Sequence, residues 1–199
     1  MCRSFLSVWY DKENNPIIDG RFNKGVVTLN LPQCAIVADG DINKFWKLLD
    51  ERLELCHKAL KFKTERLLGV KASVAPTLWM YGAYARKNAD DILDDLMVGG
   101  YSTLSLGYIG LYETIKLLTG ESNTKHQNLA LKITRYMADK CEEWNNQENY
   151  GYSLYSTPAE SLCYRFAKLD KEQFGEIKDV TDKGYYTNSH HKQQCGYIK

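Results

Sequence analysis

Short strand patterns alternate with longer amphipathic helical patterns along this chain, and this alternation constrains the fold more than any other feature. Apolar runs with a period of two residues predict strands, whereas apolar residues at three- and four-residue steps predict helices. The strand patterns lie at 26–31, at the start of 99–120 and at 150–158, and a helical pattern follows each of them. This order is typical of an α/β barrel or a doubly wound sheet. We therefore predict an α/β fold.

The clearest helix is predicted at 41–69, with Asp41 as its N-cap and Gly69 as its C-cap. Its apolar face recurs at helical spacing and consists of Phe45, Leu48, Leu49, Leu53, Cys56 and Leu60. His57 follows Cys56, but neighbouring residues diverge by about 100° around a helix and do not face each other. We therefore predict a solvated His57 that forms no pair with Cys56.

A second long helix is predicted at 124–147. Its apolar face consists of Leu129, Ile133, Tyr136, Met137, Cys141 and Trp144. Between the two long helices, Pro76 is predicted to break any helix within 73–87. The segment 88–97 carries four aspartates beside Ile92, Leu93 and Leu96. Because these apolar residues form a helical stripe, we interpret the aspartates as the solvent-exposed face of the same helix and predict no metal site.

The residues before the first strand offer a candidate binding group. The run 26–31 alternates apolar and polar side chains, and Pro32 is predicted to end it. Gly20 and Gly25 flank Asn23, and glycines allow a positive φ or a close backbone approach. An asparagine amide both donates and accepts hydrogen bonds, which suits a sugar hydroxyl or a base edge. The alternative is an ordinary glycine-flanked turn that leads into the strand.

A polar segment near the end of the chain offers a second candidate. Thr187, Asn188 and Ser189 supply hydroxyl, amide and backbone N–H groups that suit a phosphate, and the alternative is an Asn-Ser turn. The adjacent His190 and His191 have no cysteine or carboxylate at ligand spacing, so we do not expect them to bind a metal. The glycines at 107 and 110 resemble a phosphate loop only weakly. We interpret them as clearance where a strand meets its helix.

Composition limits the classes of function. The net charge is +1, so no overall field favours nucleic acid or a membrane surface. No apolar run reaches the roughly 18–20 residues needed to cross a bilayer, and no secretion signal is recognisable. The six cysteines form no Cys-x-x-Cys pair, which argues against a zinc knuckle. We expect reduced thiols, a cytoplasmic location, and no membrane or direct nucleic-acid partner.

Two blocks carry a resemblance to a known family. They are Cys-Arg-Ser-Phe-Leu-Ser at 2–7 and the segment at 20–32, which contains Gly-Arg-Phe-Asn and Val-Val-Thr-Leu-Asn-Leu-Pro. Both closely resemble the catalytic part of the anaerobic (class III) ribonucleoside-triphosphate reductases. In that family a finger-loop cysteine lies inside a ten-stranded α/β barrel and becomes a thiyl radical that abstracts the ribose 3′ hydrogen. Met1 stands where the family usually has a glycine.

The resemblance assigns roles to the candidate residues. It implies that Cys2 is the thiyl radical site, and that Asn23 binds the ribose hydroxyls and helps water to leave. It also places Thr187, Asn188, Ser189 and His190 near the triphosphate. The ending Cys-Gly-Tyr resembles the glycyl-radical motif, with Gly196 as the radical site, and a chance match is the alternative. The resemblance covers 1–191, so we predict a partial catalytic barrel domain there and a divergent tail at 192–199.

The resemblance implies an enzyme that reduces ribonucleoside triphosphates to 2′-deoxyribonucleoside triphosphates anaerobically. Its fold would be part of a ten-stranded α/β barrel of the glycyl-radical enzyme and ribonucleotide reductase type. No cofactor is expected in this segment, because a radical-SAM activating protein generates the glycyl radical in the family. The expected partners are that protein, the substrate, the missing remainder of the reductase and a second copy of the chain.

The position of Cys2 bears on completeness. A finger loop needs a scaffold on both sides, so we expect an incomplete reductase with little activity by itself. The alternative from another class is a non-catalytic remnant or a split subunit that binds a partner chain. Another glycyl-radical enzyme, such as a relative of pyruvate formate-lyase, is disfavoured by the Gly-Arg-Phe-Asn and Thr-Asn-Ser blocks.

Overall fold

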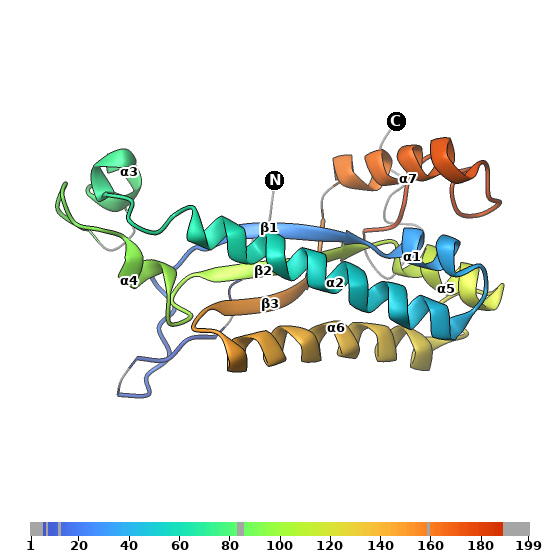
Figure 1. Ribbon diagram of the computed structural model, residues 1–199, viewed down its shortest axis with the longest axis horizontal. Coiled ribbons are helices and arrows are strands. Elements are labelled where there is room, and N and C mark those ends of the chain that lie inside the picture. Colours follow the sequence, from blue (N-terminus) through green and yellow to red (C-terminus); the bar gives the residue numbers. More distant parts are fainter. Residues whose placement is uncertain (1–5, 7, 12, 83–85, 159, 189–199) are drawn as a thin grey trace.

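The computed structural model describes residues 6, 8–11, 13–82, 86–158 and 160–188 of the 199-residue chain (Figure 1). Strands and helices alternate along it as predicted. The elements are β1 (Asn23–Asn30), α1 (Leu31–Ala38), α2 (Ile42–Glu65), the 3-10 helix η1 (Ala72–Val74), α3 (Pro76–Trp79), α4 (Asp94–Met97), β2 (Thr103–Ile109), α5 (Leu111–Thr119), α6 (Gln127–Gln147), β3 (Gly151–Ser156) and α7 (Glu160–Phe174).

The three strands form one parallel sheet in the order β1-β2-β3, which confirms the predicted α/β class. Two long helices cover one face of this sheet (Figure 1). Helix α2 contacts β1 and β2, and α6 contacts β3. Parallel neighbours need long crossover connections, which these helices supply. The opposite face carries neither of them.

The main core lies between the sheet and these two helices. The sheet contributes Leu29, Leu104, Leu106 and Tyr152, all buried. The facing helix residues are Phe45, Leu49, Leu53, Cys56 and Leu60 of α2 and Ile133, Met137, Cys141 and Trp144 of α6. These residues fall on the two predicted apolar stripes. Full burial of one such aliphatic or aromatic side chain stabilises the fold by about 1.5–3 kcal/mol.

Helix α2 begins where predicted and ends earlier. The Asp41 carboxylate accepts hydrogen bonds from the backbone N–H groups of Asn43 (2.8 Å) and Lys44 (3.1 Å), so its predicted role as N-cap is confirmed. The prediction that Gly69 caps the other end is wrong. After Glu65 the backbone N–H of Leu67 bonds to the Thr64 carbonyl, three residues back, which tightens the last turn and ends the helix. Gly69 lies in the turn that follows.

Two prolines begin helices that the sequence patterns did not predict. Pro32 ends β1 as expected, but it also lies in the first turn of α1. Pro76 lies in the first turn of the short helix α3, so the prediction that it excludes a helix from 73–87 is wrong. The first turn has no intrahelical partner for its N–H groups, and a proline there loses no hydrogen bond.

The aspartates of 88–97 bind protein groups. Asp90 pairs with Lys71, Asp95 pairs with Lys87, and Asp94 accepts from the Gly69 backbone N–H. The predicted helical stripe is shorter than expected, because α4 spans four residues only. Leu93 and Leu96 are buried, whereas Ile92 is exposed.

The described cysteines are buried thiols without a disulfide: Cys34, Cys56, Cys141 and Cys163. Burial raises the pKa of Cys34 and Cys141 from 9.0 to about 12, and that of Cys56 to about 11. A thiolate is the reactive form, so at pH 8 we expect iodoacetamide to modify these three at least about 100-fold more slowly in the folded chain than in urea. Peptide mass spectrometry over time measures the rates. Equal rates in a chain with a native circular dichroism spectrum would contradict this expectation.

Within the described residues, no helix is both long and apolar enough to cross a membrane.

Candidate functional site

The sheet face opposite α2 and α6 is polar. Alternate residues along a strand point to opposite faces. Because Leu104 and Leu106 face the helices, Thr103, Ser105 and Gly107 face the other way. We call this surface the polar face, made by Asn23, Thr28, Thr103, Ser105, Gly107, Ser153 and Tyr155, with Val26 as an apolar residue among them. Thr103 and Ser105 are fully buried, so the central strand presents hydroxyl groups in a region shielded from water.

A β-bulge turns Asn23 onto the polar face. Asn23 pairs with Thr103, and Gly25 pairs with the next residue, Leu104, so Lys24 is an extra residue in β1. Without the bulge, Asn23 would share the face of Gly25, Val27 and Leu29, which packs on the helices. A bulge changes the direction of a side chain in this way and is common next to active sites.

Two contacts orient the Asn23 carboxamide. Its Nδ2 donates to the Ser105 hydroxyl oxygen (2.5 Å), and its Oδ1 accepts from the Gly25 backbone N–H (3.0 Å). The extra residue of the bulge, Lys24, follows Asn23 in the chain. Its ammonium group donates to the Met97 carbonyl and lies 4.8 Å from the centre of the Tyr150 ring. Burial lowers the pKa of Lys24 to about 8. Asn23 is therefore held in a defined orientation at the amino end of β1.

Glycine is required at two positions beside the polar face. A Cβ at Gly107 would lie 2.0 Å from the Thr157 Oγ1 and 2.9 Å from the Thr28 Oγ1, because these side chains meet over the central strand. A Cβ at Gly110 would lie 2.2 Å from the Pro32 Cγ, and its φ of +78° is in the left-handed region. The interpretation of both glycines as backbone clearance is confirmed.

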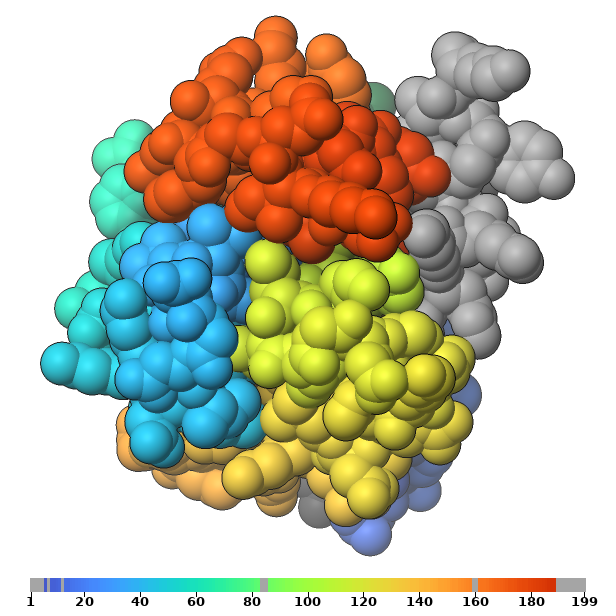
Figure 2. Space-filling view, turned by 90° about the vertical axis from the view of Figure 1, so that its right-hand side faces the viewer, coloured from blue at the N-terminus to red at the C-terminus, as the bar shows by residue number. Residues whose placement is uncertain are grey.

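Helix N-termini gather at the carboxyl end of the sheet. Helices α1 and α5 start directly after β1 and β2, and no side chain caps either helix. They contact each other, and Figure 2 shows them side by side at this end, with the orange-red α7 region beside them. The first N–H groups and the helix dipole make such termini favourable for anions.

The predicted phosphate segment reaches this end of the sheet. The Gly110 backbone N–H donates to the Thr187 carbonyl (2.6 Å), and the Ser156 hydroxyl donates to the Asn188 carbonyl (2.9 Å). Thr187 and Asn188 therefore lie beside the ends of β2 and β3 and the start of α5. Sequence spacing alone could not indicate this position.

Both donors of Thr187 bind Glu113. The Thr187 N–H (3.2 Å) and hydroxyl (2.8 Å) donate to the Oε2 of this fully buried carboxylate. The other oxygen accepts from the Lys183 ammonium (2.6 Å), whose side chain is 13% exposed. The ammonium also lies 5.0 Å from the Tyr112 ring centre and 5.6 Å from that of Tyr185. Glu113 was not identified from the sequence, because its partners are 70 or more residues away.

A second buried carboxylate, that of Asp170, binds Tyr186, the residue before Thr187. Asp170 of α7 accepts from Asn30 (2.8 Å), Gln33 (3.0 Å) and the Tyr186 hydroxyl (2.8 Å). Burial and the negative charge of Asp170 both raise the pKa of Tyr186. The segment before Asn188 is thus tied to α5 through Glu113 and to α7 through Asp170.

The structure does not bring the two predicted groups together. Asn23 pairs with Thr103 at the start of β2, whereas Thr187 lies beyond Ile109 at its end. At about 3.3 Å per residue these six steps correspond to about 20 Å along the sheet. Cys2, Ser189, His190 and Gly196 lie outside the described residues, as does the predicted tail at 192–199.

Comparison with known proteins identifies the family. The sequence model of the family described as "Anaerobic ribonucleoside-triphosphate reductase" matches residues 1–195. The chain belongs to the anaerobic ribonucleoside-triphosphate reductase family. It is 49% identical over 195 residues to the reductase of Escherichia coli K12, a match that covers 96% of this chain and 27% of the relative. The reductase of Enterobacteria phage T4 is 48% identical, with 96% and 31% covered. The chain therefore spans less than a third of these relatives.

Solved structures agree on the fold. The anaerobic ribonucleotide reductase from Thermotoga maritima, crystallised with citrate in the active site, superimposes with a TM-score of 0.64 at 20% identity. The match covers 88% of this chain and 33% of that one. A second structure described as an anaerobic ribonucleotide reductase gives a TM-score of 0.65 at 19% identity, with 86% and 28% covered. The chain thus holds part of the reductase α/β barrel fold, as predicted.

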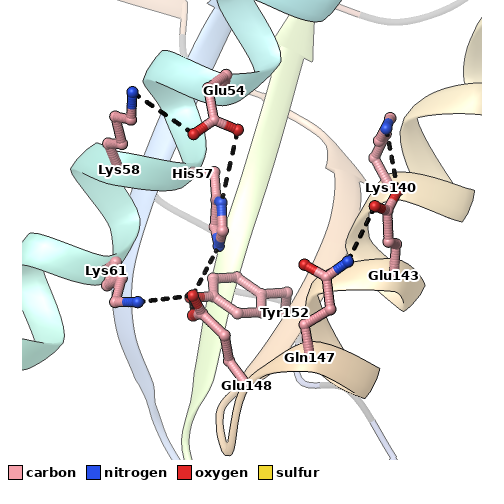
Figure 3. Close-up of polar contacts among 9 residues, drawn as sticks. All are labelled: Glu54, His57, Lys58, Lys61, Lys140, Glu143, Gln147, Glu148 and Tyr152. Atoms are coloured by element: carbon pink, nitrogen blue, oxygen red, sulfur yellow. Dashed lines mark hydrogen bonds and ion pairs between the residues drawn. The ribbon is translucent and has the colours of Figure 1, made fainter.

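In this member of the reductase family, one predicted surface residue is largely buried. His57 stacks on Trp144 with ring centres 4.4 Å apart and planes 2° apart, and its side chain is 12% exposed. Figure 3 shows its ring between Glu54 and Glu148, with its Nε2 3.5 Å from a Glu148 oxygen. The prediction of a solvated His57 is wrong. His57 lies four residues after Leu53 and three before Leu60, so it extends the buried stripe towards α6.

Proposed function

We propose that this chain forms part of the catalytic barrel of an anaerobic reductase that converts ribonucleoside triphosphates to 2′-deoxyribonucleoside triphosphates. Family membership supports the reaction class. The observation that carries the proposal is the oriented Asn23 carboxamide on the polar face. The further length of the relatives would supply the rest of the barrel.

In this proposal Asn23 is the ribose contact. Removal of a ribose hydroxyl as water needs groups that hold one hydroxyl and donate to another, and a carboxamide does both. Asn23 is already oriented before substrate arrives, so it needs little reorganisation during the reaction. Ser105 and Thr103 beside it are fully buried, which suits chemistry that must exclude water. Cys2 would supply the thiyl radical, as the family resemblance implies.

The carboxyl end of the sheet is proposed as a separate phosphate-binding region, because about 20 Å along the sheet is farther than the triphosphate of one nucleotide extends from its ribose. Two helix N-termini without side-chain caps favour an anion there. We assign Thr187 to anchoring this region, because its N–H and hydroxyl are both bound to Glu113. Asn188 and the residues predicted with it, Ser189 and His190, are the proposed phosphate contacts.

The proposed partners follow from the reductase reaction. A radical-SAM activating protein would generate the glycyl radical, for which Gly196 is the candidate in this chain. A homodimer and the remaining reductase segments complete the proposed assembly. Buried thiols without a disulfide fit a reducing compartment, so we propose the cytoplasm as the location.

A second candidate function is a non-catalytic remnant or split subunit that binds a partner chain. The chain spans 27% to 31% of the length of the relatives named above. A remnant would keep the fold and lose nucleotide binding, whereas a split subunit would regain activity when the missing segments are added.

The two candidates differ in nucleotide binding. We expect ATP, GTP, CTP or UTP to bind the purified chain in the micromolar range by calorimetry. Asn23→Ala should weaken this binding about 10-fold, because one or two hydrogen bonds to the ribose are lost, at about 0.5–1.5 kcal/mol each. Equal affinities would contradict the role of Asn23. No binding by a chain that melts cooperatively would favour the remnant.

A further inference from the structure

We propose that Ser105 is a positioning residue that sets the orientation of the Asn23 carboxamide. This inference rests on the proposed function, in which Asn23 contacts the ribose. Ser105 lies on the central strand and is fully buried. Its hydroxyl oxygen accepts a hydrogen bond from the Asn23 Nδ2 at 2.5 Å.

The Gly25 contact selects one of the two amide orientations of Asn23, and the Ser105 contact holds the amino end in that orientation. The Gly25 N–H can only donate, so it requires the carbonyl end of the amide, Oδ1, at 3.0 Å. The amino end then points to Ser105. A flipped amide would place its NH₂ group against the Gly25 N–H, leaving two donors opposed and unsatisfied. The bulge at Lys24 and the hydroxyl of Ser105 therefore act together.

The neighbouring strand provides a matched control. Ser153 pairs with Ser105 in the β2–β3 register and faces the same side of the sheet. Its Oγ is buried and has no hydrogen-bond partner in the described part of the chain. Ser153→Ala therefore removes the same chemical group from the same rung of the sheet without a contact to Asn23.

The first test measures the side-chain NH₂ signals of Asn23 directly by NMR and needs no nucleotide. In ¹⁵N-labelled protein the side-chain NH₂ signals of Asn23 are assigned by their loss in Asn23→Ala. We expect Ser105→Ala to shift these signals, because the hydrogen bond from Nδ2 is removed. Ser153→Ala should leave them in place. Unchanged signals in Ser105→Ala would overturn the inference. Ser105→Cys, which keeps the volume and weakens the acceptor, provides the same test if the alanine variant does not fold.

The second test measures how the same variants change the affinity for nucleotide. We expect Ser105→Ala to weaken binding about 5-fold to 10-fold. In the Asn23→Ala background, Ser105→Ala should have no further effect, because it acts through Asn23. Equal effects in both backgrounds would overturn the positioning role. If Ser105→Ala shifts the NH₂ signals but the wild-type chain binds no nucleotide, the result supports the positioning role and counts against the proposed function.

Discussion

Glu113→Gln is expected to lower the free energy of unfolding by about 3–5 kcal/mol. The change leaves the Lys183 ammonium charged in a region where it is 13% exposed and has lost its carboxylate. Removing one partner of a buried ion pair has a cost of this size, since the remaining charge is desolvated without compensation. Thr187 also loses a charged acceptor for its N–H and hydroxyl. Urea denaturation followed by circular dichroism at pH 7 measures the change.

Two controls make this expectation specific. Glu113→Gln combined with Lys183→Met removes both charges and should recover most of the lost stability. Glu121→Gln changes a carboxylate that pairs with Lys125 and His126 at the surface, where the expected loss of stability is much smaller than at Glu113. If the double variant were less stable than Glu113→Gln alone, the isolated charge of Lys183 would not be the cause.

Gly110→Ala is expected to lower the free energy of unfolding by about 2–5 kcal/mol. An L-residue at φ +78° costs about 1–2 kcal/mol. Its Cβ would also lie 2.2 Å from the Pro32 Cγ and 2.5 Å from the Cδ, atoms of a rigid ring in the first turn of α1. Relief of such overpacking costs about 1–3 kcal/mol more. The same denaturation experiment measures the loss.

The other end of the same helix provides the control. Gly120 caps α5 at φ +75°, and a Cβ there would meet nothing within 4 Å. Gly120→Ala should therefore carry only the backbone cost, about 1–2 kcal/mol. If the two variants lost equal stability, the contact with Pro32 would not contribute. A larger loss at Gly110 would show that α1 and α5 are held together closely at the carboxyl end of the sheet.

These two variants also bear on the proposed phosphate region. Glu113 holds Thr187 through its side chain, and Gly110 holds the same residue through its backbone N–H. Asn23 lies about 20 Å away along the sheet, at the opposite end of the strands. Changes at Gly110 and Glu113 should therefore act on the proposed phosphate region without moving Asn23.

The sequence by itself determined part of the local structure. Asp41 binds N–H groups two and three residues away, and Gly120 closes α5 onto the Lys116 carbonyl four residues back. Such short-range contacts can be recognised from residues that are close together in the sequence. The apolar stripes of α2 and α6 also followed from spacing alone, because helical period decides which residues share a face. The family resemblance likewise depended on two contiguous blocks.

Only the tertiary structure decided how distant residues meet. The bulge that turns Asn23 onto the polar face depends on register with β2, some 80 residues later. Glu113 and Lys183 are 70 residues apart, and His57 is buried by Trp144 of another helix. These contacts form because the packing of sheet and helices brings the elements together, and no local pattern encodes that geometry. The orientation of Asn23 and the anchoring of Thr187 are therefore properties of the folded chain.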